Sequence, residues 1–373
     1  MINKTRLVNY FLALAVINSP TRKEKAIADV LEADLRALGC EVVRDKAGEH
    51  IAGDTGNLIA TLKGNIPDAV PILLCAHMDT VLPTEEWGYT QSDGIIKSTG
   101  KTILGADDKA GIAAIMEALR VVCEKGIQHG DIQVAFTIAE ETGLWGAKFL
   151  DYGLIRAKCA FVYDMGKPTG CVTVSAPSHD NVICRVHGKA AHAGARPEDG
   201  VNAIVVASKA IASMRLGRVD SETTANVGVI QGGVARNIVP DYCEVKGEAR
   251  SRNNAKLDAQ VQHMVEMFQN AAAEMNAKVD VEVERSYDTY KLSEEDMVVR
   301  IAVEAARRVG IEPERHETGG GSDASIFNAK GLPATVIGVG YENAHSVDEY
   351  LSIDDFVKSA QMAIEIIRVA AGS

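Results

Sequence analysis

The sequence predicts an α/β protein, in which a mixed and largely parallel sheet is flanked by helices and carries an inserted ferredoxin-like domain. Three observations predict this fold class. Helical and apolar strand patterns alternate in the first part of the chain, a βαββαβ order begins at about Pro177, and the α/β rhythm returns after Ser286. We therefore predict one discontinuous domain of residues 1–176 and 287–373, with an inserted domain of residues 177–286.

The first part of the chain supplies two helices, five strands and a third helix. Leu7, Leu14 and Ile17 recur at helical spacing near the N-terminus, and a second amphipathic helix ends at Gly39, as a C-terminal cap would. Strands are predicted at Cys40–Arg44, Asn57–Leu62, Ile72–Ala76, Gln133–Ile138 and Cys159–Tyr163, and a helix at Ala110–Lys125. The runs Ile72–Ala76 and Gln133–Ile138 are apolar enough to be buried on both faces of a sheet.

The rest of the chain supplies the inserted domain and the return to the first one. The inserted elements are strand Asn181–His187, helix Gly200–Met214, strands Ala225–Ile230 and Tyr242–Arg250, helix Asn254–Met275 and strand Val279–Glu284. Helix Met297–Val309, strand Ala334–Val339 and helix Ile353–Val369 then follow. Ser352 and Asp355 resemble a capping box at the start of the last helix.

Composition excludes several classes of partner. Asp and Glu total 51 against 39 Lys and Arg, so the net charge is -12, and there are no basic runs. Neither a nucleic acid nor an anionic membrane is therefore expected as a partner. The seven cysteines are scattered without a CxxC pair, which is typical of free thiols in a reducing compartment. Since no apolar stretch approaches the ~20 residues of a membrane span, we expect a cytoplasmic protein.

Acidic and histidine side chains follow the predicted strands of the larger domain. They are His77 and Asp79, the pair Glu140 and Glu141, Asp164, His345, and Asp107 at the start of a helix. Each alone has an ordinary reading, such as a structural histidine, a solvated loop pair or a helix N-cap. In an open α/β sheet, however, ligands bind outside the carboxyl ends of the strands, so these residues are expected to meet at one edge.

Two histidines and three carboxylates are ligands that suit zinc, manganese or cobalt. Two divalent ions outweigh the charge of three carboxylates, and this surplus favours a bridging hydroxide near neutral pH. A carboxylate outside the ligand set is then needed to take the proton of the water and pass it to the leaving amine. One member of the pair Glu140 and Glu141 fits that task while the other holds metal.

Three motifs resemble a known family. His77–Val81, Gly105–Gly111 and Glu140–Gly143 are similar to the co-catalytic zinc peptidases, a superfamily that includes peptidase T, carboxypeptidase G, aminoacylase and succinyl-diaminopimelate desuccinylase. The resemblance covers nearly the whole chain and is closest to the peptidase T-like branch. It implies a zinc exopeptidase-like catalytic domain, an inserted dimerisation and lid domain, and a metallopeptidase that acts as a homodimer on short peptides.

The resemblance also implies a role for each site residue. Asp107 would bridge two zinc ions, His77 and Asp164 would complete one site, and Glu141 and His345 the other. Glu140 would be the general base and Asp79 the residue that orients His77. Family members carry a cis peptide after the bridging aspartate, so one is expected between Asp107 and Asp108.

The inserted domain is expected to contribute to the same site. Gly188–Gly194 resembles the segment whose histidine, here His192, reaches the active site of the partner subunit and steadies the oxyanion. Asn237 and Arg250 match positions that hold the substrate carboxylate, with Arg252 as a competitor for that role. Gly321 and Ser322 belong to Gly319–Asp323, which lines the substrate pocket in the family.

One position bears on the choice of substrate. The residue at the place of Asp164 tends to be Asp in aminopeptidases and dipeptidases, and Glu in aminoacylases and carboxypeptidases. Asp164 therefore favours an aminopeptidase of the tripeptidase type. The alternatives are an N-acyl amino acid hydrolase, a carboxypeptidase or a dipeptidase of the same superfamily, and, more distantly, a non-catalytic peptide-binding homologue.

Two other features have plain structural interpretations. Cys75 is expected in the core rather than as a nucleophile, because a reactive thiolate needs partial exposure and a cationic neighbour. The acidic residues of the C-terminal stretch, Asp348, Glu349, Asp354 and Asp355, are expected on a solvated face.

Overall fold

The computed structural model describes residues 2–372 as two compact units. Within these residues, unit 1 comprises 2–174, Leu292–Glu317 and 322–372, and unit 2 comprises Ser175–Lys291 and Thr318–Gly321. The short return segment Thr318–Gly321 is a difference from the predicted layout, which put it in the discontinuous domain. It belongs to unit 2 because Thr318 donates its N–H to the carbonyl of Ser175 at 2.9 Å and Gly321 lies against Tyr287.

Unit 1 is built on a six-stranded mixed sheet, as the sequence predicts. The strand order is β1–β2–β6–β3–β7–β16, in which β6, β3, β7 and β16 run parallel and β2 is antiparallel to both of its neighbours, β1 and β6. The strands are β1 (Glu41–Arg44), β2 (Leu58–Leu62), β6 (Ile132–Thr137), β3 (Ile72–His77), β7 (Cys159–Val162) and β16 (Ala334–Val336). Apart from shifts of one to three residues at their ends, these are the predicted strands.

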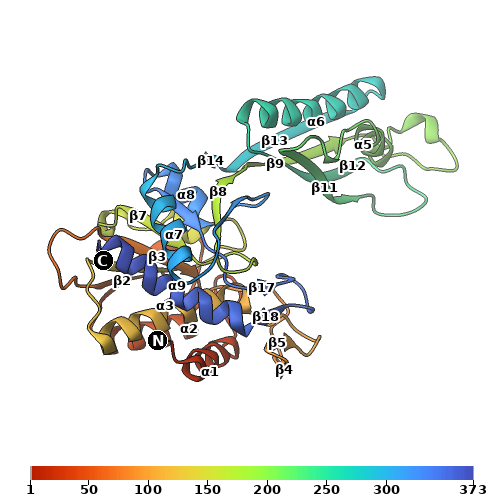
Figure 1. Ribbon diagram of the computed structural model, residues 1–373. Helices are drawn as coiled ribbons and strands as arrows, with labels where there is room; N and C mark the ends of the chain where they lie inside the picture. Colours follow the sequence, from red (N-terminus) through yellow and green to blue (C-terminus); the bar gives the residue numbers. More distant parts are fainter. Residues whose placement is uncertain (1, 373) are drawn as a thin grey trace. The chain divides into compact units, whose positions relative to one another are not determined.

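Helices cover both faces of this sheet. They are α1 (Lys4–Ala15), α2 (Lys25–Ala37), α3 (Ala106–Lys125), α4 (Trp145–Lys148), α7 (Met297–Arg308), α8 (Asp323–Ala329) and α9 (Ile353–Ala370), with single 3₁₀ turns at Ala47–His50 and Tyr152–Leu154. In Figure 1, α3 lies beside α1 and α9 and packs on β3. Leu74 and Ala76 join the core on that side, whereas Cys75 between them faces Asp323 at the start of α8.

Two small sheets were not predicted. One has the order β17–β18–β5–β4, and the other the order β14–β8–β15. Their strands are β17 (Tyr341–Glu342), β18 (Tyr350–Ser352), β5 (Ile95–Ser98), β4 (Tyr89–Ser92), β14 (Tyr290–Lys291), β8 (Cys171–Ala176) and β15 (Glu314–Glu317). Most are short and polar, and all four residues of β4 are exposed, so they lack the apolar alternation by which a strand is recognised.

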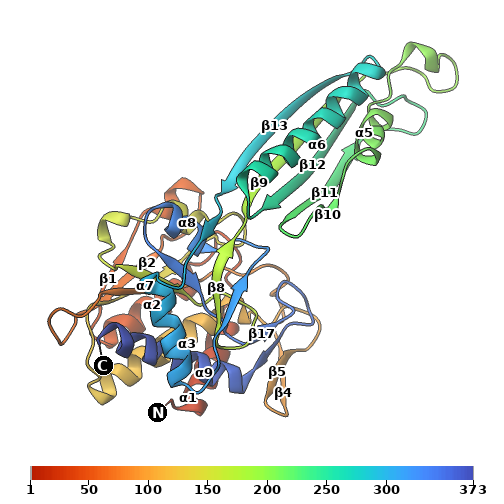
Figure 2. The same ribbon diagram turned by 45° about the horizontal axis from the view of Figure 1, so that its top comes forward.

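Unit 2 has the predicted βαββαβ order. Its elements are β9 (Ser178–His187), the 3₁₀ turn Pro197–Asp199, α5 (Ala203–Ala212), β10 (Gly217–Arg218), β11 (Thr223–Gly232), β12 (Tyr242–Ser251), α6 (Asn254–Glu274) and β13 (Lys278–Tyr287). The antiparallel sheet has the order β10–β11–β12–β9–β13. Without the edge strand β10, this is the order of a ferredoxin-like unit. Figure 2 shows α5 and α6 on one face of the sheet, where a separate core includes Val245, Leu257 and Phe268.

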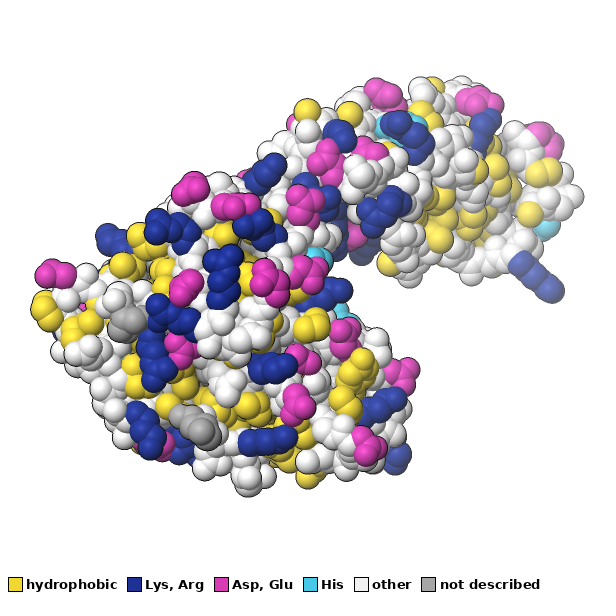
Figure 3. All heavy atoms as spheres, viewed as in Figure 1, with side chains coloured by type: hydrophobic (Ala, Val, Ile, Leu, Met, Phe, Trp, Pro, Cys, Tyr) yellow, Lys and Arg dark blue, Asp and Glu magenta, His cyan; other side chains and the backbone are white. Residues whose placement is uncertain are grey.

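Several local features predicted from the sequence can be compared with the structure. The peptide between Asp107 and Asp108 is cis, as expected, and the side chain of Ser352 caps α9 at the N–H of Asp355. All seven cysteines are free, and Cys123 alone among them is exposed. Within residues 2–372, no helix is long and apolar enough to cross a membrane. On the face drawn in Figure 3, acidic and basic side chains are interspersed rather than gathered by sign.

Candidate active site

The predicted metal ligands all lie in unit 1, at the ends of its strands and helices. His77 is the last residue of β3, Glu141 follows β6, and Asp164 follows β7. Asp107 stands at the start of α3, where its backbone and that of Asp108 depart from helical geometry before the regular helix begins. His345 lies in the loop between β17 and β18, so five distant segments meet at one edge of the sheet.

Two groups of ligand atoms share Asp107. The first is His77, Asp107 and Asp164, and the second is Asp107, Glu141 and His345; within each group the ligand atoms lie within 4.8 Å of one another. Nε2 of His77 is 3.1 Å from Oδ1 of Asp107, and Nε2 of His345 is 3.2 Å from Oδ2. The two oxygens of Asp107 thus face different histidines, which is the arrangement a bridging carboxylate requires.

The donor set fits divalent cations. Each group offers one imidazole nitrogen and two carboxylates, which suits zinc, manganese or cobalt. Oε1 of Glu141 is buried and has no hydrogen-bond partner in the described part of the chain, although a buried carboxylate oxygen normally has one. Nδ1 of His77 lies 2.9 Å from the backbone carbonyl of Asp79. A proton on that nitrogen leaves Nε2 free to bind a cation.

Burial and the two histidines shift the pKa values of the carboxyl groups in opposite directions. Burial raises the pKa of Asp164 well above its usual range, and burial likewise raises the pKa of Glu141 despite its hydrogen bond to His345. Burial would also raise the pKa of Asp107, but its bonds to His345 and His77 outweigh that effect and lower it. Asp107 and Glu141 in turn raise the pKa of His345 to about 10. The site is therefore an acidic centre that attracts positive charge.

Glu140 lies beside both groups and belongs to neither. It is half-buried, and burial together with the charge of Asp164 raises the pKa of its carboxyl well above the usual range. Its backbone N–H donates to Oδ1 of Asp79 at 2.9 Å, which fixes the start of the turn that also carries Glu141. A carboxylate outside the ligand set is thus held next to it, as the proposed proton transfer requires.

Asp79 contacts more groups than His77, the residue that it was predicted to orient. Its carboxylate accepts hydrogen bonds from the N–H groups of Glu140 and Glu141 and from the hydroxyl of Thr21, the last at 2.7 Å. Its Oδ1 is 3.5 Å from Nδ1 of His77, which is farther than the backbone carbonyl of Asp79 itself. The side chain of Asp79 therefore holds the turn that carries both glutamates, and its backbone contacts the histidine.

Sequence reasoning missed three side chains around this centre. The hydroxyl of Tyr341 donates to Asp164 at 3.1 Å and lies 3.4 Å from Asp107. The buried carboxylate of Glu24 accepts the N–H of Ala139, the residue before Glu140, at 3.0 Å. A buried tyrosine next to a ligand segment could have been suspected from its polar tip, whereas nothing near Glu24 in the sequence links it to the site.

The third missed residue, Glu349, corrects an expectation. Of the acidic stretch near the C-terminus, Asp348 and Asp354 are exposed, but Glu349 is 1% exposed. Its carboxylate accepts the N–H groups of Leu104, Gly105 and Asp107 at 2.7, 2.8 and 3.0 Å. The prediction of a solvated face was wrong for Glu349 because partners far away in sequence satisfy its charge.

Four of the predicted residues belong to unit 2, where the structure brings His192 and Asn237 together. The N–H of Ala193 donates to the carbonyl of Asn237 at 3.0 Å, and His192 forms a bridge with Ile238. Nδ1 of His192 accepts the N–H groups of Gly194 and Ala195, so the ring proton of a neutral imidazole lies on Nε2. His192 can therefore donate a hydrogen bond through Nε2.

Arg250 and Gly321 are the other two predicted site residues in unit 2, and both lie beside Tyr287. Nε and Nη2 of Arg250 donate to Glu248, both at 3.1 Å, and Nη1 donates to the hydroxyl of Tyr287 at 3.4 Å. Gly321 lies against the ring of Tyr287. Arg252 instead donates to the carbonyl of Ser221, and Ser322, in unit 1, caps α8 with its hydroxyl.

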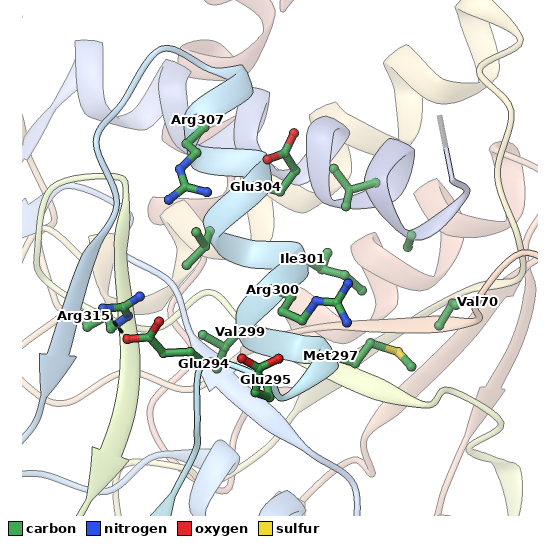
Figure 4. A pocket seen from close by; sticks show the side chains of 13 residues that line it. Val70, Glu294, Glu295, Met297, Val299, Arg300, Ile301, Glu304, Arg307 and Arg315 are labelled. Carbon is green, nitrogen blue, oxygen red and sulfur yellow. Dashed lines mark ion pairs between the residues drawn. The ribbon is translucent and has the colours of Figure 1, made fainter.

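A separate cavity of about 650 Å³ lies along α7 (Figure 4). Figure 4 shows side chains of both signs around it, among them Arg300, Glu304 and the ion pair of Arg315 with Glu294. Its lining, taken over residues 2–372, contains none of the predicted site residues. Size alone therefore does not mark the functional site of this chain.

Comparison with known proteins decides the family. Residues 73–369 match the model of peptidase family M20/M25/M40. The chain belongs to this family. The resemblance to its peptidase T-like members is thereby confirmed, and the chain is a metallopeptidase.

Three relatives illustrate the similarity. The structure of aminopeptidase PepT from Bacillus cereus ATCC 10987 is 43% identical with a TM-score of 0.90, and both chains are covered completely. A tripeptidase from Staphylococcus aureus subsp. aureus Mu50 is 41% identical with a TM-score of 0.95, also over all of both chains. Peptidase T of Geobacillus kaustophilus (strain HTA426) is 28% identical over 98% of each chain.

Proposed function

We propose that this metallopeptidase is a dinuclear zinc aminopeptidase that releases the N-terminal residue of short peptides, with tripeptides as the preferred length. One observation carries the proposal: Asp107 belongs to two complete ligand groups, with Glu140 beside both. The two similar proteins of known structure, an aminopeptidase and a tripeptidase, support the choice of substrate. Manganese or cobalt would suit the same donors.

Each residue of the site would have a distinct role in the reaction. Asp107 would bridge two metal ions, with His77 and Asp164 at one and Glu141 and His345 at the other. When bound, the metals supply Lewis acidity and lower the pKa of a water molecule. Glu140 then accepts the proton of the attacking water and passes it to the leaving amine, and Asp79 keeps the Glu140 turn in place.

Unit 2 would bind the substrate. Nη1 of Arg250 faces the hydroxyl of Tyr287 rather than a carboxylate, so it can bind the C-terminal carboxylate of a short peptide. Asn237 lies beside His192, at the other end of β12, and would reach the same carboxylate from the partner subunit. Arg250 is preferred to Arg252 because it lies close to Gly320 and, through Tyr287, to Gly321. Nε2 of His192 would donate to the developing oxyanion.

We further propose a homodimer in which His192 serves the active site of the partner subunit. Exposed hydrophobic residues on unit 2 support an interface there: Val229, Ile230, Val234, Ile238 and Tyr242. In Figure 3, hydrophobic side chains gather on the visible face of this unit. The free cysteines support a cytoplasmic location.

The substrate class is tested with one unblocked tripeptide and its N-acetylated twin, with zinc added to the metal-free protein. We expect hydrolysis of the free tripeptide only. Faster hydrolysis of the acetylated peptide would favour an N-acyl amino acid hydrolase or carboxypeptidase, and would show that Asp164 does not select substrates as proposed. Hydrolysis of dipeptides at an equal rate would favour a dipeptidase.

Replacement of the general base tests the mechanism. Glu140→Ala should bind two metal ions per chain as the natural protein does, but should lower kcat by ~10²–10⁴-fold. Asp348→Asn, which changes an exposed carboxylate on the same unit, is the control and should keep full activity. Full activity of Glu140→Ala would refute its assignment as the base.

Mixed dimers test the role of His192. His192→Ala alone should lose most activity without losing metal. Mixing it with Glu140→Ala should restore part of the activity, since one active site of the mixed dimer then has both an intact Glu140 and an intact His192 from its partner. If the mixture stays inactive while mixed dimers form, His192 does not act across subunits.

A further inference from the structure

Glu349 contacts the backbone that leads into the bridging aspartate. The residue is almost completely buried, and its two carboxylate oxygens accept three backbone N–H groups, those of Leu104, Gly105 and Asp107. Its own carbonyl accepts the N–H of Ser98 at 3.1 Å, at the end of β5. Glu349 is thus fixed by its backbone to one sheet and by its side chain to the loop before α3.

The N–H groups in question would otherwise lack partners. They lie in the buried, non-helical backbone just before the regular part of α3, where an N–H group without an acceptor is costly. Gly105, in the capping position, has no side chain, so it cannot supply the bond. The missing cap comes instead from Glu349, far along the chain.

Glu349 also lies close in sequence to the ligand residue His345. His345 is only four residues before Glu349, in a loop where its φ is +64° and its side chain is 55% exposed. A loop residue that is so exposed has few packing contacts to hold it in place. The nearby link between this loop and the Asp107 backbone is the carboxylate of Glu349.

We propose that Glu349 is a positioning residue of the metal centre: by binding the Leu104–Asp107 backbone, it fixes the separation between the ligand atoms of Asp107 and His345. The proposal rests on the two-metal function above. It follows that loss of this carboxylate weakens metal binding, and that it does so most at the group of Asp107, Glu141 and His345, because both ends of the link belong to that group.

The test uses Glu349→Gln in the full chain. The amide keeps the size of the side chain but replaces one acceptor oxygen with an NH₂ group, which faces a backbone N–H and cannot accept its hydrogen bond. The control is Asp348→Asn, a neighbouring carboxylate that is 73% exposed and pairs only loosely with Lys97, at 3.8 Å. Zn²⁺ affinity is measured on metal-free protein by competition with a chromophoric chelator, and Co²⁺ absorption spectra report the ligand geometry.

We expect Glu349→Gln to bind the weaker of its two Zn²⁺ ions about 10–100-fold less tightly than the natural protein, with a changed Co²⁺ spectrum and an unchanged circular dichroism spectrum. Asp348→Asn should match the natural protein. Hydrogen exchange on the metal-free proteins should show faster exchange at Leu104–Asp107 in Glu349→Gln. Should that variant fail to fold, Glu349→Asp keeps the charge but shortens the reach, and the same weakening is expected.

Three results would overturn the proposal in distinguishable ways. Unchanged Zn²⁺ affinity and Co²⁺ spectrum in a folded Glu349→Gln with a lower unfolding midpoint would make Glu349 a purely structural residue. Equal weakening in Asp348→Asn would make the effect one of net charge. Failure of the natural protein to bind two Zn²⁺ ions would overturn the proposed two-metal function, and the role of Glu349 with it.

Discussion

Gly321→Ala should destabilise unit 2, whereas Gly319→Ala, two residues away, should not. A Cβ at position 321 would lie 2.3 Å from Cζ and 2.5 Å from Cε2 of Tyr287, which is far inside van der Waals contact. At position 319 a Cβ would have no heavy atom within 4 Å. Overpacking of this kind costs about 1–3 kcal/mol, while Gly→Ala at an open position is neutral or slightly stabilising.

The ring of Tyr287 is the group that must move. It is 8% exposed, packs against His179 with ring centroids 5.3 Å apart, and accepts a hydrogen bond from Arg250. Its displacement removes support from Arg250. We therefore expect Gly321→Ala to raise KM for a tripeptide about tenfold while kcat changes less, because binding of the substrate carboxylate would weaken.

The unfolding assay must report on the correct unit. Both tryptophans, Trp87 and Trp145, lie in unit 1, so tryptophan fluorescence does not follow unit 2. Hydrogen exchange of peptides from β13, measured at increasing urea concentrations, does follow the unfolding of unit 2. Equal midpoints for Gly321→Ala and Gly319→Ala would refute the reasoning, as would an additional cost of Gly321→Ala when Tyr287 has already been replaced by Ala.

Three further outcomes are expected. Glu117→Ala should lower the free energy of unfolding by about 1–3 kcal/mol, because it leaves the N–H of Asn3 without its acceptor and the Arg6 guanidinium with the exposed Glu124 alone; equal urea midpoints would contradict this. Removal of metal by a chelator should lower the thermal midpoint reversibly, since ions at 100 times Kd add about 2.7 kcal/mol, and the loss should disappear when zinc is restored. Burial raises the pKa of Glu24 to about 7, so its neutral form stabilises the metal-free protein below about pH 4.5, and this contribution is lost as the pH rises through 7. In the natural protein the free energy of unfolding should therefore decline by up to about 3 kcal/mol between pH 4.5 and 7, and Glu24→Gln should lack this decline. Parallel pH profiles of the two proteins would contradict this role of Glu24.

The main sheet and the order of unit 2 could be predicted because their strands are apolar runs with clear ends. Ile72–His77 and Ile132–Thr137 are buried throughout, so their burial is visible in composition alone. The small sheet of β4, β5, β17 and β18 could not be predicted, because pairing between short polar strands depends on which loops meet in the folded chain. Tyr89–Ser92 has no apolar residue that points inward.

That the candidate metal-binding side chains cluster was predictable for a different reason. These residues are chemically unusual at strand ends, and motifs around His77, Asp107 and Glu140 carry them. The supporting carboxylates were not predictable, because Glu24 and Glu349 act through backbone N–H groups, which are the same in every sequence. A buried acid that binds backbone has no partner residue type to search for, so only the fold reveals it.

The division of the chain into a discontinuous unit 1 and an almost continuous unit 2 has a consequence for synthesis on the ribosome. Residues 175–291 of unit 2 emerge as one stretch and can pack their own core before unit 1 is complete. Unit 1 cannot be completed until β16 and α9 have been synthesised. The group of side chains that includes His345 likewise cannot form before that residue emerges. A nascent chain stalled before that point would hold the complete group of His77, Asp107 and Asp164, but would lack the histidine of the second group.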